Sequence, residues 1–327
     1  MTARGAPGPI PLLTRFPALE AVPRVPLGTF PTPVQRLATL DSPAPLWIKR
    51  DDLSAEEFGG NKVRALEYLL AGVGPGDTVL TVGGEGSTHV LTTAAHARRL
   101  GAAVVAVRWR HEMNPIADQV EARARTLLSE VTTSGGAVSG MLRALGERIA
   151  GKVHWVPAGG TSPLGMLGHV NAALELVAQM AAGAAPRIGR VVAPLGSGGT
   201  VAGLALGFAI AETPVTVVGA RVVSRVVANE PRVRLLAHRA ARMIERLTGE
   251  RLPRPARLEI LHGAYGGAYG RATAAGEAAR AALHDTAGIR LDATYSAKAL
   301  AAALGGEVGA PVLFWLTFDA RWLADGD

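Results

Sequence analysis

From residue 46 onward, short runs of apolar residues alternate with longer segments in which apolar positions recur every three or four residues. The short runs predict buried strands, and the longer segments predict helices with one apolar side. The predicted strands cover residues 46–49, 77–82, 103–109, 153–156, 190–195, 215–223 and 311–317. The predicted helices begin at Lys62 and then cover 88–100, 115–130, 166–180, 201–210, 231–248, 273–286 and 297–303. Asn61 is the expected N-cap of the first of these helices.

Strand and helix alternate along most of the chain, which favours parallel sheets joined by right-handed crossovers and therefore an α/β fold. The first forty residues are Pro-rich and irregular. Residues 131–151 show no clear element, and we expect this second segment to be a mobile part of the inner domain. The uncharged run 191–211 has the length of a membrane helix of about 20 residues. Because Pro194 and several glycines interrupt it, we interpret it as a strand, a loop and a helix.

Composition narrows the possible chemistry. The chain has no cysteine, which excludes disulfides, thiolate metal sites and cysteine nucleophiles and fits the reducing cytoplasm. The net charge of +7 suggests nucleic acid, but the arginines are scattered without interleaved aromatics, so we expect a solvated surface and no nucleic-acid partner. Lysine occurs only at Lys49, Lys62, Lys152 and Lys298. Since arginine cannot form an imine, any imine chemistry has only these carriers.

Lys62 follows a glycine loop and opens a helix. The positive end of the helix dipole and burial both disfavour the ammonium form, so both lower the pKa of this lysine. A lowered pKa is what an aldehyde-binding lysine needs. The alternative is an ordinary surface lysine near a helix start.

A second loop, Gly196-Ser197-Gly198-Gly199-Thr200, joins a buried strand to a buried helix. Backbone N–H groups in such a loop form a cradle for a phosphate or carboxylate, and the two hydroxyls add donors. The loop lacks the Gly-Lys-Ser/Thr ending of a Walker motif, and Val201 stands at the third glycine position of the dinucleotide fingerprint. The pattern therefore suits a lone phosphate, although a tight structural turn and a nucleotide-dependent dehydrogenase remain alternatives.

A third loop offers hydroxyl and amide donors for a carboxylate at Ser87, Thr88 and His89. His89 can act as a base or a ring partner, or it is a satisfied core histidine. The histidines are dispersed and no paired-histidine motif occurs, so we expect no metal. A Gly-x-Ser-x-Gly nucleophile elbow is also absent from the sequence.

Taken together, these segments resemble the 1-aminocyclopropane-1-carboxylate deaminase and D-cysteine desulfhydrase family of pyridoxal-phosphate enzymes. The resemblance rests on residues 48–53, 59–67, 87–89, 156–165, 195–200, 269–270 and 291–299, in the family's order. It implies fold type II, the tryptophan synthase β-like fold of two parallel-sheet α/β domains. The large domain would comprise residues 1–64 and 170–327, and the small inserted domain residues 65–169. It also implies a homodimer.

The resemblance also implies roles for individual residues. Lys62 would bind pyridoxal 5′-phosphate as a Schiff base, and Gly196, Ser197, Gly198, Gly199 and Thr200 would hold its phosphate. Ser87 would contact the substrate carboxylate and relay protons, with Thr88 and His89 beside it. Tyr269 and Tyr295 would face the reacting carbons or the ring, and Thr317 would reach toward the pyridine nitrogen.

This chain departs from the family at several of these positions. Thr88 replaces an asparagine, and Phe318 follows Thr317 where the family has glycine, whose backbone a side chain cannot copy cheaply. Ser296 stands where deaminases carry glutamate and desulfhydrases carry threonine, which favours the desulfhydrase side.

We therefore expect a lyase that abstracts the α-proton of a small amino acid and eliminates a β-substituent, giving a keto acid and ammonia. The alternatives are ring opening of the cyclopropane substrate and a degenerate protein that only binds the cofactor or an amino acid.

Overall fold

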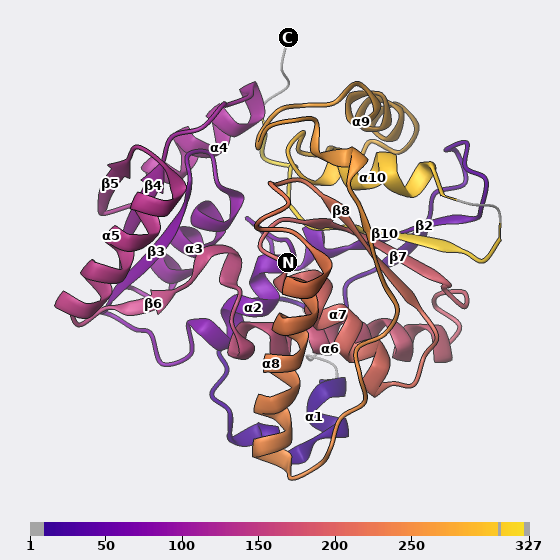
Figure 1. The fold of residues 1–327 in the computed structure, drawn as a ribbon, viewed down its shortest axis with the longest axis horizontal. Coiled ribbons are helices and arrows are strands. Elements are labelled where there is room, and N and C mark those ends of the chain that lie inside the picture. Colours follow the sequence, from indigo (N-terminus) through magenta and orange to yellow (C-terminus); the bar gives the residue numbers. More distant parts are fainter. Residues whose placement is uncertain (1–9, 307–308, 324–327) are drawn as a thin grey trace, which may run out of the picture.

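Two β-sheets, each covered by helices, organise residues 10–306 and 309–323, the part that the computed structural model describes (Figure 1). The six-stranded sheet has the order β1-β2-β10-β7-β8-β9, and the four-stranded sheet has the order β5-β4-β3-β6. Only β1 runs antiparallel, to β2; every other pairing is parallel among the described residues. The α/β fold with parallel sheets is therefore confirmed.

The bounds of the strands and helices are as follows. The strands are β1 (Val34–Arg36), β2 (Leu46–Arg50), β3 (Thr78–Gly84), β4 (Ala103–Trp109), β5 (Glu130–Ser134), β6 (His154–Val156), β7 (Arg190–Leu195), β8 (Thr216–Arg221), β9 (Leu258–Leu261) and β10 (Val312–Leu316). The α-helices are α1 (Pro11–Arg15), α2 (Asn61–Leu69), α3 (Thr88–Arg99), α4 (Pro115–Arg125), α5 (Ala137–Ala150), α6 (Pro163–Ala181), α7 (Gly199–Ile210), α8 (Glu230–Thr248), α9 (Ala274–Ala287) and α10 (Ser296–Leu304).

The large sheet is buried on both faces, which explains its nearly continuous apolar strands. In β10, Leu313 and Trp315 join the core formed with α6, α7 and α8, whereas Val312 and Phe314 join the core formed with α9 and α10. Successive side chains of a strand point to opposite faces, so one apolar strand serves both layers. Figure 1 shows these helices on the two sides of the sheet.

The four strands of the smaller sheet lie between residues 78 and 156, inside the segment that we expected to form the inserted domain. The proposed boundaries at 64/65 and 169/170 fall within α2 and α6, and they stay a prediction. No helix of the described residues is both long and apolar enough to cross a bilayer.

Several elements differ from the sequence-based expectation. Residues 131–151 form most of β5 and all of α5, which the pattern hides because β5 is a half-exposed edge strand and α5 carries apolar residues on its outer side. The irregular start contains α1 and β1, β9 was not expected, and α4 ends at Arg125 rather than at residue 130. Asn61 is not the N-cap of α2: that position is Gly60, and Asn61 lies inside the helix.

Candidate active site

A cavity of about 310 Å³ lies between the two sheets, where β3, β4, β7, β8 and β10 end. In parallel α/β sheets, ligands collect at the carboxyl ends of the strands. The predicted site residues that line this cavity are Lys62, Ser87, Thr88, His89, Gly196, Ser197, Gly198, Thr200, Tyr269, Tyr295 and Thr317. Gly199 does not line it, because it packs against Thr161.

Lys62 reaches the cavity because the loop before it makes a close approach to the end of β10. Gly60 has φ +124° and forms a bridge to Phe318, and a Cβ at Gly60 would collide with the carbonyl oxygen of Thr317. The backbone N–H of Asn61 donates to that same oxygen at 3.1 Å. Glycine is therefore required at position 60, and the sharp turn places Lys62 at the start of α2, facing the cavity.

The Lys62 ammonium is disfavoured in this position. Burial lowers the pKa of Lys62 to about 8, against a weaker opposing effect of the Asp292 carboxylate. Its Nζ donates a hydrogen bond of 3.3 Å to Asn61 Oδ1. A pKa of about 8 leaves roughly a tenth of the amine neutral at pH 7, far more than in an unperturbed lysine, and the neutral amine is the form that attacks an aldehyde.

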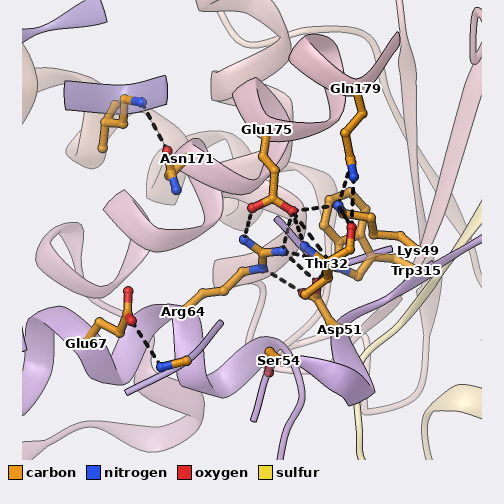
Figure 2. Close-up of polar contacts among 12 residues, drawn as sticks. Thr32, Lys49, Asp51, Ser54, Arg64, Glu67, Asn171, Glu175, Gln179 and Trp315 are labelled. Carbon is orange, nitrogen blue, oxygen red and sulfur yellow. Dashed lines mark hydrogen bonds and ion pairs between the residues drawn. The ribbon is translucent and has the colours of Figure 1, made fainter. Parts of the chain in front are cut away.

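Two residues after Lys62, Arg64 enters a buried network of charges that fixes α2 (Figure 2). Its guanidinium donates to Asp51 at 2.7 and 2.8 Å and to Glu175 at 2.9 and 3.0 Å. Lys49 Nζ completes the network at 2.5 Å from Glu175. These four side chains are almost fully buried, and their opposite charges balance. The network joins β2, α2 and α6, and it holds α2 two residues along the chain from Lys62.

The loop at the start of α7 has the form of an anion cradle. The N-cap of α7 is Gly198, which has φ +96° and no side chain. No side chain therefore accepts a hydrogen bond from the N–H groups of the first turn at this cap. Any other residue at position 198 would be strained by this positive φ, and its Cβ would lie only 3.0 Å from the side chain of Leu236. Thr200 Oγ1 accepts from Asn61 Nδ2 at 2.7 Å, and Ser197 Oγ accepts from Thr161 at 2.7 Å. Backbone donors and two fixed hydroxyls suit a phosphate.

The α3 terminus supplies the third group of polar atoms. Ser87 is the N-cap of α3, buried and lining the cavity, and its Oγ accepts from the Val90 N–H at 3.4 Å. His89 also lines the cavity, but its Nε2 lies 3.0 Å from Thr81 Oγ1, and burial lowers its pKa to about 3. A histidine with that pKa stays neutral near pH 7, so this geometry favours the core-histidine interpretation over a basic role.

Tyr269 and Tyr295 form a pair on another wall of the cavity. Their hydroxyls share a short hydrogen bond, and burial raises the pKa of Tyr269 to about 12 and that of Tyr295 well above its usual value. The buried Asp292 accepts from the backbone N–H of Tyr295 at 2.6 Å, which fixes the start of α10. Both phenols therefore keep their protons near neutral pH and are weak acids there.

Thr317 and Phe318 close the cavity at the end of β10. The expected strain at Phe318 is not found, because among described non-glycine residues only Phe58 and Glu212 have positive φ. The ring of Phe318 packs edge-on against Trp322 instead. This aromatic contact accommodates the side chain that replaces glycine.

The sequence reasoning missed several cavity residues. Asn61 was treated only as a cap, although its amide joins Lys62 to Thr200. Trp109, Val223, Val227 and Tyr265 also line the cavity. Trp109 and Val223 each end a predicted strand, and those positions were usable signals. Val227 and Tyr265 lie in connections whose placement only the fold reveals.

The fold and the cavity define a class of enzyme: an α/β protein that can hold a phosphorylated aldehyde between a low-pKa lysine and a glycine cradle. The chain matches the family "Pyridoxal-phosphate dependent enzyme" over residues 25–317, and it belongs to that family. The glycine cradle and the amine of Lys62 fit the phosphate and aldehyde of this cofactor. The chain is therefore a pyridoxal-phosphate-dependent enzyme.

The chain is also similar to individual members of this family. The chain is 36% identical over 335 residues to "Nocardicin C-9′ epimerase" of Nocardia uniformis subsp. tsuyamanensis, covering 93% of this chain and 94% of the relative. It is 33% identical over 315 residues to "D-cysteine desulfhydrase" of Salmonella choleraesuis, covering 91% and 90%. A crystal structure of an "ACC deaminase homologue" superposes with a TM-score of 0.79 at 28% identity, covering 95% of both chains. These similarities confirm the resemblance and fold type II.

Proposed function

We propose that the chain is a lyase that eliminates a β-substituent from a small amino acid such as D-cysteine, producing a keto acid and ammonia. One observation carries the choice of reaction: no carboxyl group lines the cavity in the described part of the chain. Opening a cyclopropane ring needs an acid for the departing carbon. A thiolate leaves without such help, because it is stable as an anion near neutral pH.

Ser296 supports the same choice. It stands where deaminases of the family carry glutamate, and here it is fully buried and does not line the cavity. The phenols of Tyr269 and Tyr295 keep their protons and supply the available acid groups of that wall. Because their pKa values are raised, these phenols are weak acids, so this wall favours a leaving group that departs as an anion without protonation.

Each proposed role follows from the position of the residue. The cofactor, when bound, supplies an electron-withdrawing ring that eases loss of the α-proton. The Lys62 amine, whose pKa is lowered to about 8, would accept that proton. Ser87 and the first N–H groups of α3 bind the substrate carboxylate, with Thr88 beside them. Gly196, Ser197, Gly198 and Thr200 would hold the phosphate, with Gly199 contributing through its backbone alone, and Thr317 would bind the ring nitrogen.

The test is a panel of D-cysteine, L-cysteine, β-chloro-D-alanine and the cyclopropane amino acid, scored for keto acid, ammonia and sulfide. We expect D-cysteine or the chloro analogue to give the highest catalytic efficiency. A clear preference for the cyclopropane substrate would assign the chain to the deaminases instead. Exchange of the α-proton without elimination would place it with the epimerase relative. Inactivity with full cofactor binding would leave only a cofactor- or amino-acid-binding protein.

We also propose that the enzyme is a cytoplasmic homodimer. The absence of cysteine fits a reducing compartment. The outer face of α5 supports association, because Val138, Met141, Leu142, Leu145 and Ile149 form an exposed apolar stripe there. Light scattering of the purified protein tests the dimer, and Leu142→Glu is the variant expected to weaken it.

A further inference from the structure

The active-site cavity has two chemically different ends. Its inner end is polar, with the half-buried Lys62 amine and the buried hydroxyls of Ser87, Thr200 and Thr317. The lining residues most exposed to solvent are Ala137, at the start of α5, and Ser224 and Val227, in the turn before α8. Together with the partly exposed Trp109, Val223 and Tyr265 they define what we call the outer end. None of these six side chains carries a charge, and all but Ser224 are apolar or aromatic.

The wall of the outer end is held firmly. The guanidinium of Arg221 lies 4.5 Å from the centre of the Tyr265 ring and donates to the carbonyl oxygen of Val223 at 2.6 Å. Val227 lies in a turn that is closed by a hydrogen bond of 3.1 Å from its own N–H to the carbonyl oxygen of Ser224. The amide of Asn229 donates to the carbonyl oxygens of residues 225 and 226, which fixes that turn. The apolar surface is therefore preformed and needs no ordering when it binds a ligand.

The charges of an amino-acid substrate are matched only at the inner end. The phosphate cradle, Lys62 and the start of α3 occupy that end, so the substituent of the amino acid is left with the apolar outer end. A thiol group alone would leave Trp109, Val227 and Tyr265 exposed to water. An apolar group on the sulfur would bury against them, which is favourable in proportion to the area removed from water.

We propose that the preferred substrates are cysteines that carry an apolar alkyl or aryl group on sulfur, rather than free cysteine. This proposal rests on the β-elimination proposed above. In the reaction the Cβ–S bond breaks and its electron pair goes to sulfur, which takes a proton and leaves as a thiol. Water supplies the oxygen of the keto acid, and the nitrogen leaves as ammonium. An S-substituted cysteine and water thus give a thiol, pyruvate and ammonium, without oxidant or reductant.

The test uses a homologous series of S-methyl, S-ethyl, S-propyl and S-butyl D-cysteine, with D-cysteine as reference. Alkyl thiolates of this series are equally good leaving groups, so differences report binding in the outer end. We expect kcat/KM to rise by roughly fourfold per buried methylene, the factor that corresponds to about 0.8 kcal/mol. A flat or falling series, with D-cysteine turned over, would refute the inference and leave the elimination intact.

Val227 provides a matched pair of variants. Val227→Asp places a charge in the lining, whereas Val226→Asp places the same charge on a neighbour that is 87% exposed and does not line the cavity. We expect Val227→Asp to abolish the dependence on chain length, and Val226→Asp to leave both that dependence and the D-cysteine rate unchanged. An undiminished dependence in Val227→Asp would contradict the assignment of the outer end.

A binding measurement separates this inference from the proposed reaction. Unreactive D-amino acids from D-alanine to D-norleucine carry no leaving group, and calorimetry gives their dissociation constants with the holoenzyme. We expect affinity to increase along this series and the increase to vanish in Val227→Asp. If affinity rises but no substrate is eliminated, the elimination is wrong and the apolar specificity holds. If affinity does not rise, the specificity is wrong.

Discussion

The buried charge network of Lys49, Asp51, Arg64 and Glu175 gives a prediction whose size can be worked from the structure (Figure 2). Arg64→Met removes the guanidinium and retains most of the packing volume of the side chain. Asp51 and Glu175 then share only Lys49, so one negative charge stays buried without a partner. The exposed fraction of each of these carboxylate side chains is at most 4%, so water cannot replace the lost contacts.

We expect Arg64→Met to lower the free energy of unfolding by about 3–5 kcal/mol, the usual cost of breaking a buried pair by removing one partner. Glu175→Gln alone leaves one positive charge in excess. The double variant Arg64→Met/Glu175→Gln restores neutrality between Lys49 and Asp51. Its loss should therefore be smaller than the sum of the two single losses, by roughly 1–3 kcal/mol of coupling.

Urea denaturation of the apoenzyme, followed by circular dichroism, measures these differences. Arg234→Met is the control, because the Arg234–Glu230 pair is about half exposed at both side chains and should contribute less than about 1 kcal/mol. A loss below about 1 kcal/mol for Arg64→Met would refute the reasoning, as would strictly additive losses in the double variant.

Other consequences concern pH and the cavity. Burial alone would raise the pKa values of Asp51 and Glu175, but Arg64 holds both values below their usual range. The stability that these two carboxylates contribute is therefore present above about pH 4 and is lost as the pH falls through the lowered pKa values. Acid titration of unfolding free energy should show this loss in the wild type and not in Arg64→Met. The rate at which the apoenzyme captures the cofactor should rise with pH, reach half of its limiting value near pH 8, the pKa of Lys62, and level off above that pH; a rise continuing past about pH 10 would indicate an unperturbed lysine. Gly196 has an ordinary φ, and a Cβ there would make only a normal van der Waals contact of 3.5 Å with Tyr295, so Gly196→Asp should leave folding unchanged and weaken cofactor affinity by more than about tenfold through charge repulsion. Gly74→Asp is the surface control, and equal affinities of Gly196→Asp and the wild type would make the loop only a structural turn. Ser87→Ala should keep the bound cofactor and lose most turnover, and wild-type kinetics would remove Ser87 from the mechanism.

The sequence pattern predicts the strands of the buried sheets well because both faces of these strands are covered. Residues 103–109 and 190–195 are strands with the predicted bounds, since their apolar runs end at a polar or glycine position. The pattern fails where an element is half covered. β5 is an edge strand, and α5 buries only Gly140 and Ala144 while its apolar side chains face outward.

The candidate site was predicted from loops that follow strands, because a strand, a glycine loop and a helix start imply a ligand without knowledge of the fold. Lys62, Ser87 and Thr200 were found in this way, and they meet in one cavity. Asn61 was wrongly assigned as a helix cap because Thr200, the residue that its side chain contacts, lies 139 residues away in the sequence. Val227 and Tyr265 carry no local signal, since only the packing of separate connections brings them to the cavity.

The central claim is that Lys62 carries the cofactor, and borohydride reduction tests it most directly. Both Lys62 and Lys298 have a pKa lowered to about 8, but only Lys62 lines the cavity. Reduced holoenzyme, digested and analysed by mass spectrometry, should carry the cofactor on the peptide that contains Lys62. Label on Lys49, Lys152 or Lys298, or no label on any lysine, would contradict the account.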